Sequence, residues 1–216
     1  GCPTPPTVAN FSLAALGGTW YQAAMSARFA TTVERGAPCA TATYTPAAAD
    51  GDVAAATVRS CLLLSRASLA AAADGGAPHQ PPSPATDGRP VVACTRGLLA
   101  TPDVGRAPGR LELSFPPHPP GRFWVLAADG GGGGGGRFTT AVVWSCAEGG
   151  GPGRAAAQDL MVLTRRRAVA RAAVDAATAA AEAGGVALGA DNGMLMTDQG
   201  VDCVYFDDEG AAVVEG

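Results

Sequence analysis

The sequence contains no lysine, so all 15 of its cationic side chains other than histidine are arginines. Alanine, glycine and proline are abundant, and together these features indicate a biased genomic base composition more than a particular function. The formal net charge is −4 at pH 7 and the charges are scattered, so there is no basic surface to attract nucleic acid or anionic lipid. We therefore expect no nucleic acid among the partners of this chain.

Long hydrophobic runs are also missing. No apolar segment approaches the roughly 20 residues needed to span a bilayer. The sequence does not open with a charged segment followed by an apolar one, which is the pattern of a secretory signal. These absences predict a processed, soluble chain without a transmembrane segment.

Histidine is scarce, since the chain has only His79 and His118, both in segments expected to be loops. With two isolated histidines, neither a Cys-His nor a Ser-His-Asp arrangement can be nominated, so no catalytic residue is predicted. The cysteine spacings are unlike those of a CxxC metal site, so no metal ligand is predicted either. No cofactor is expected to be required.

Six cysteines are present, an even number, and this favours three disulfides in an oxidising compartment. Eight short, half-apolar segments separated by Gly, Pro and Asp clusters are typical of β-strands. We predict strands near 18–26, 39–45, 53–64, 90–98, 109–115, 122–128, 138–146 and 159–165.

One amphipathic helix is predicted at about 167–183, followed by Gly184-Gly185. Eight strands and one helix predict an all-β fold, an eight-stranded antiparallel up-and-down barrel with the C-terminal helix packed on its outside. The length fits a single domain over 1–216, with the barrel at about 17–165 and a C-terminal tail at 184–216.

Several motifs resemble those of lipocalins. Gly18-Thr19-Trp20 opens the first strand, and the segments 140–146 and 160–165 stand where lipocalins have their last two strands. The opening Cys2-Pro3 and the closing 197–203, with Thr-Asp-Gln and a cysteine, are similar to apolipoprotein D-like and chloroplastic (thylakoid lumen) lipocalins. The resemblance covers nearly the whole chain and implies a binding protein for a small hydrophobic molecule.

The resemblance also implies structural roles at one end of the barrel. Trp20 should plug the closed end, and Arg165, at the end of the last strand, should stack on its indole. Gly18 belongs to the same opening motif. Of the family's middle motif only Asp129 is kept, which puts the structure of the closed-end loop in doubt.

The family pattern implies the disulfide pairing as well. Apolipoprotein D-like chains join cysteines at positions that match Cys2 with Cys146 and Cys39 with Cys203. Cys61 and Cys94 are then left over, on neighbouring antiparallel strands where chloroplastic lipocalins also carry cysteines.

If Cys39 and Cys146 point outward, strand alternation turns the residues one, three and five positions away from each of them inward. The predicted ligand-binding residues are Tyr44, Phe29, Met161, Val143, Ala42 and Trp124. Tyr44 would be a hydrogen-bond anchor, and Phe29 would lie in the first loop of the mouth. The faces of Phe123 and Trp124 are open at this stage. Arg28 at the mouth is a candidate contact for a ligand carboxylate.

Four loops should share the barrel mouth, at 27–38, 67–89, 116–121 and 147–158, while the seven-glycine run 130–136 should lie at the closed end. The insertion 67–89 is either a lid or docking arm, or an expansion tolerated because loop closure costs little.

Three functions are weighed. The first is a carrier of a lipid, sterol, retinoid or carotenoid, secreted or in the thylakoid lumen. The second is a docking subunit of a larger assembly, such as a membrane-protein complex facing the lumen, recruited through proline-rich segments such as 116–120. The third, a lipocalin-fold enzyme acting on a lipid or xanthophyll, lacks a nominated nucleophile.

Overall fold

The computed structural model describes residues 1–34, 38–47, 54–64, 91–130, 136–149, 156–200, 203, 205–206 and 212–213. The loop predicted at 67–89 and His79 lie outside these ranges.

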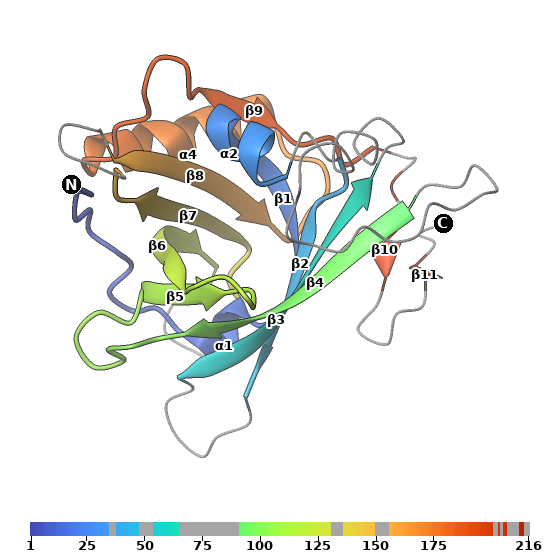
Figure 1. Ribbon diagram of the computed structural model, residues 1–216, viewed down its shortest axis with the longest axis horizontal. Coiled ribbons are helices and arrows are strands. Elements are labelled where there is room, and N and C mark those ends of the chain that lie inside the picture. Colours follow the sequence, from blue (N-terminus) through green and yellow to red (C-terminus); the bar gives the residue numbers. More distant parts are fainter. Residues whose placement is uncertain are drawn as a thin grey trace.

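Eight antiparallel strands form a closed barrel, as predicted (Figure 1). Each strand pairs with the next along the chain, and β1 closes the ring by pairing with both β8 and β2. Their bounds are β1 (Gly18–Ser26), β2 (Thr41–Pro46), β3 (Ala55–Leu64), β4 (Val91–Ala100), β5 (Arg110–Ser114), β6 (Gly121–Asp129), β7 (Thr140–Ala147) and β8 (Ala157–Thr164). All eight strands predicted from the sequence are confirmed, because alternation of apolar and polar residues is a local signal.

The C-terminal helix α4 (Arg171–Ala183) packs on the outside of the barrel beside β8 (Figure 1). Its buried Val174 and Ala181 lie in one apolar cluster with Trp144 and Val162 of the wall. The helix begins four residues later than the predicted 167. Ala170 is extended and caps the helix, and Arg167 lies with its guanidinium carbon 3.9 Å from the Tyr205 ring centre.

Five smaller elements were not predicted. They are α1 (Leu13–Leu16), α2 (Ala27–Thr32), β9 (Met194–Met196), β10 (Tyr205–Phe206) and β11 (Ala212–Val213). Strand β9 adds to the sheet by pairing antiparallel with the end of β1. On that edge β1 pairs with β2 over 18–21 and with β9 over 24–26, so it changes partner half-way along.

The pleat of the closed sheet separates two apolar clusters. One fills the interior and includes Trp20, Tyr44, Leu111, Phe123 and Val143. The other lies outside, beneath α4, and includes Trp144, Leu160 and Val162. This separation places Trp144 and Val142 outside and Ala141 and Val143 inside, on the faces that alternation from Cys146 predicts.

The end of the barrel opposite α2 is sealed by Trp20 and Arg165. Trp20 is fully buried and its indole Nε1 donates to the carbonyl oxygen of Leu16 at 2.6 Å. The Arg165 guanidinium carbon lies 3.9 Å from the Trp20 ring centre, and its nitrogens donate to the carbonyls of Leu16, Gly17, Thr19 and Phe138. One side chain therefore ties the start of β1 to the end of β8.

Gly18 makes room for this arrangement. Its φ of +93° is a conformation that other residues rarely adopt, and an added Cβ would lie 3.2 Å from Arg165 Nη1. Asp129 ends β6 at the same end of the barrel, where its carboxylate accepts a hydrogen bond from the Thr139 hydroxyl at 2.8 Å.

Three disulfides join Cys2 to Cys146, Cys39 to Cys203 and Cys61 to Cys94, the pairs that the family resemblance implies. The first two span 144 and 164 residues and fasten the chain's two terminal segments to the outer wall. Three disulfides in one chain form and persist in an oxidising compartment.

We predict that Arg165→Ala lowers the free energy of unfolding by about 3 kcal/mol, because it removes the cation over Trp20 and leaves backbone carbonyls without donors. Chemical denaturation measures the change. The control is Arg166→Ala, since Arg166 is the exposed neighbour in sequence. Equal losses in the two variants would contradict the sealing role of Arg165.

Candidate ligand-binding site

The interior of the barrel is packed at its closed end and accessible towards its mouth. Inward-facing side chains near the closed end, such as Ala56, Leu99 and Leu111, are fully buried. Their counterparts near the mouth are partly exposed, although they occupy the same inner face by register. We call this accessible part the mouth half, and it is lined by Ala42, Ser60, Leu62, Ala93, Thr95, Leu113 and Phe29.

Five of the six predicted ligand-binding residues lie in or against the interior cluster. Tyr44, Val143 and Met161 belong to its buried part, and Ala42 and Phe29 pack against it from the mouth half. Phe29 comes from α2, which replaces the irregular loop expected at the start of 27–38. These placements bring the five together in one apolar chamber.

The sixth, Trp124, was predicted wrongly. It lies on the outer face, where its ring is 5.1 Å from that of Trp144 and Arg110 stacks over it at 4.6 Å. Successive residues of a strand point to opposite faces, so its neighbour Phe123 points inward and lies 6.0 Å from the Tyr44 ring. Phe123 is therefore the interior aromatic of β6.

The Tyr44 hydroxyl is an unpaired polar group in this apolar chamber. Tyr44 is 3% exposed, and its hydroxyl has no hydrogen-bond partner among the residues that the structure describes. Burial raises the pKa of Tyr44, while the charge of Arg165 opposes the rise, so the phenol stays protonated. A protonated phenol can donate a hydrogen bond to a bound molecule.

Arg28 forms an ion pair within the protein. Its guanidinium pairs with Asp159 of β8, a buried side chain whose other oxygen accepts from the Ser26 hydroxyl at 2.9 Å. The backbone N–H of Arg28 donates to Asn192. Because the cation is neutralised by a buried acid, Arg28 holds α2 against the barrel wall.

Glu34 is a second buried acid at the mouth. It follows α2 and is 8% exposed, and its Oε2 accepts a hydrogen bond from Gln22 Nε2 at 2.7 Å. Gln22 stands two residues after Trp20 on β1, and its amide nitrogen also lies 3.2 Å from the sulfur of Met25, an interior residue. The Glu34 carboxyl is therefore on the inner side of β1.

Burial raises the pKa of Glu34 from its ordinary value of 4.5 to about 7, and the hydrogen bond from Gln22 opposes part of that rise. Sequence analysis missed Glu34, Gln22 and Asp159. Single polar residues beside a predicted mouth loop are normally solvated, and no local pattern distinguishes a buried one.

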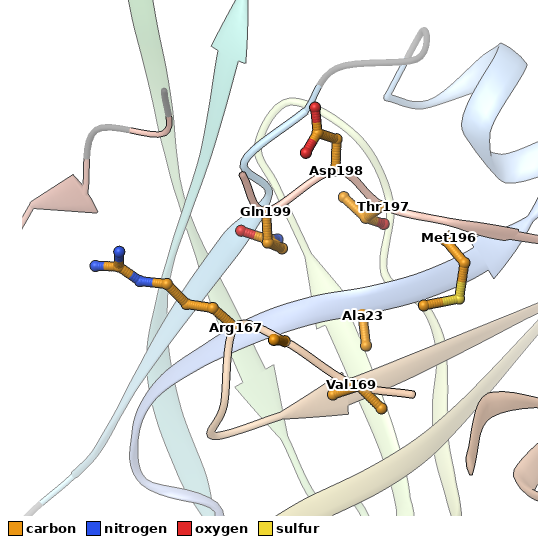
Figure 2. Close-up of a pocket in the computed structure, with 8 residues that line it drawn as sticks. Ala23, Arg167, Val169, Met196, Thr197, Asp198 and Gln199 are labelled. Carbon is orange, nitrogen blue, oxygen red and sulfur yellow. The ribbon is translucent and has the colours of Figure 1, made fainter. Parts of the chain in front are cut away.

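A separate groove of about 250 Å³ lies on the outer wall, between Ala23 of β1, the segment 167–169 and the segment 196–199. Figure 2 shows the Arg167 guanidinium directed away from Ala23 and Val169. The groove is separated from the interior by the sheet, so it is not part of the chamber.

Within the described ranges, no group of three or more His, Cys, Asp or Glu side chains is arranged to hold a metal ion. None of the helices that the structure describes has the length and apolar character required to cross a membrane.

Comparison with known proteins gives a structural match only. No family model and no curated protein matches the sequence. Among solved structures, insecticyanin from the tobacco hornworm Manduca sexta is 17% identical with a TM-score of 0.60, covering 92% of this chain and 86% of that one. Lobster apocrustacyanin A1 is 17% identical with a TM-score of 0.56, covering 88% and 80%.

H1 crustacyanin from the lobster Homarus americanus is 16% identical with a TM-score of 0.55, covering 94% of this chain and 95% of that one. These neighbours are lipocalins with a closed eight-stranded barrel. The chain has the lipocalin fold. Within the lipocalin fold, the chamber described above occupies the barrel interior, with its mouth beside α2.

We predict that Glu34→Gln stabilises the protein more at pH 8 than at pH 5. In the unfolded chain the carboxyl ionises above 4.5, whereas in the folded protein it stays neutral up to about 7. The wild type therefore loses stability relative to the variant as pH rises between these values, by about 2–3 kcal/mol in all.

Denaturant unfolding at both pH values measures this difference. Glu112→Gln, on the exposed outer face of β5, is the control for the same chemical change. A gap between wild type and Glu34→Gln that stays constant from pH 5 to pH 8 would contradict the buried, neutral carboxyl.

Proposed function

We propose that this chain binds one small hydrophobic molecule, such as a lipid, sterol, retinoid or carotenoid, in the mouth half of the barrel. The observation that carries the proposal is the apolar inner face that remains partly exposed at the mouth while the closed end is packed. Burial of a ligand's apolar surface against such a wall supplies most of the binding free energy.

Individual residues have distinct parts in this proposal. Met161 and Val143 contact the ligand from β8 and β7, and the unbranched thioether of Met161 adapts to its shape. Phe29 and Ala42 flank the entrance. The Tyr44 hydroxyl hydrogen-bonds to a polar group at the inner end of the ligand, if the ligand has one.

The proposal is for a binding protein and not an enzyme. The six cysteines are all paired in disulfides, so none supplies a thiolate nucleophile. The described histidine, His118, stands on an exposed loop. The proposed subtype is apolipoprotein D-like or chloroplastic, supported by the disulfide pattern, and the proposed compartment is extracellular or the thylakoid lumen.

A second candidate is a docking subunit that contacts a larger membrane-protein complex. It is favoured by the proline-rich loop at the mouth, in which residues 116–120 are all exposed. The His118 N–H donates to the carbonyl oxygen of Phe115, so these prolines stand on a turn and not on the extended segment that the sequence suggests.

The deciding experiment is native mass spectrometry of the protein isolated from its source, followed by organic extraction. We expect one stoichiometric hydrophobic molecule. An empty barrel that co-purifies with large subunits would favour the docking role and reject the carrier role.

We also predict that Ala42→Phe weakens binding of the extracted molecule at least tenfold, because the larger side chain occupies the mouth half. Thr43→Phe is the matched control, since Thr43 is the adjacent residue and its hydroxyl bonds to Thr19 on the outer face. Both variants are first checked for an intact barrel by circular dichroism. Equal affinities in the two variants would place the ligand elsewhere.

A further inference from the structure

The mouth of the chamber carries a buried acid, Glu34, that forms no ion pair with any described residue. The hydrogen bond from Gln22 engages only Oε2 of Glu34, and within the described part of the chain nothing donates to Oε1. Gln22 Nε2 also lies 3.4 Å from the Thr197 hydroxyl, so its amide is shared between β1, Glu34 and the segment after β9. The second carboxyl oxygen of Glu34 can therefore accept a hydrogen bond from a bound molecule.

The described charged side chains near Glu34 have other partners. Arg28 on α2 is already paired with Asp159 on β8, and Asp198, after β9, accepts from the backbone of Gly200. The pKa of Glu34 is raised by burial and lowered by the hydrogen bond from Gln22. Among the described residues, the mouth contains two buried acids, Glu34 and Asp159, and the partly exposed cation Arg28, which pairs with Asp159.

We propose that the mouth selects hydrophobic ligands whose outer end is a hydroxyl group, which donates a hydrogen bond to Oε1 of Glu34, and rejects ligands that end in a carboxylate. This inference rests on the proposed carrier function and narrows its ligand class to apolar alcohols. An ionised carboxylate placed beside Glu34 meets a second acid in a poorly solvated site, and like charges there cannot both ionise without a cost.

The selection depends on pH. Burial raises the pKa of Glu34 to about 7, so the side chain is largely neutral at pH 5.5 and ionised at pH 8. A ligand carboxylate is repelled most strongly when Glu34 is ionised, so the preference for alcohol over acid increases as pH rises.

The test compares all-trans-retinol with all-trans-retinoic acid, which share one carbon skeleton and differ at the terminal group. Binding is measured by quenching of protein fluorescence at pH 5.5 and pH 8. At pH 8 we expect the wild type to bind retinol at least tenfold more tightly than retinoate, and at pH 5.5 we expect this ratio to shrink.

Two variants of the acid make the assignment specific. In Glu34→Gln the amide oxygen still accepts from retinol but carries no charge, so retinoate binding at pH 8 should rise about tenfold and the pH dependence should disappear. Glu34→Asp keeps the charge and should keep the discrimination. Glu112→Gln, on the outer wall, should leave both affinities unchanged.

The outcomes separate this inference from the carrier proposal. If the wild type binds both retinoids equally, or if Glu34→Gln leaves the ratio unchanged, the selection by Glu34 is wrong while the carrier function stands. If a folded wild type binds neither retinoid nor any extracted hydrophobic molecule, the carrier function fails and the inference fails with it.

Discussion

The closed barrel depends on the pairing of one strand, β1, with three other strands. One edge of this strand pairs with β8, and the other pairs first with β2 and then with β9. This sharing closes the sheet, and closure is what creates an inside and an outside from simple alternation. At the start of β1, Trp20 and Arg165 seal one end, so the chamber is accessible from the opposite end, its mouth.

The change of partner along β1 explains where the polar groups of the mouth lie. Where β1 leaves β2, the Gln199 side chain bridges the carbonyls of Gln22 and Ala40, and Cys39 is tied to Cys203 nearby. The C-terminal segment thus completes the wall. Gln22 and Glu34 become buried because this segment and α2 cover them, which turns ordinary polar residues into a selective feature of the entrance.

The two ends of the chamber have different physical character. The closed end is apolar and packed, and it carries the neutral phenol of Tyr44. At the mouth, the described residues include the buried acids Glu34 and Asp159, and Arg28 pairs with Asp159. A ligand that is hydrophobic along its length and uncharged at its outer end matches both ends.

The sequence by itself determined the eight strands, the outer helix, and the inward faces of Tyr44, Ala42 and Val143, because a period of two and a period of 3.6 are local signals. The motif resemblance also identified Trp20, Arg165 and the disulfide pairs. Only the tertiary structure decided that Trp124 faces outward, that Arg28 is occupied by Asp159, and that Glu34 is buried. These properties arise from contacts across up to 175 positions of the chain, such as that between Gln22 and Thr197, which exist only after the barrel has closed.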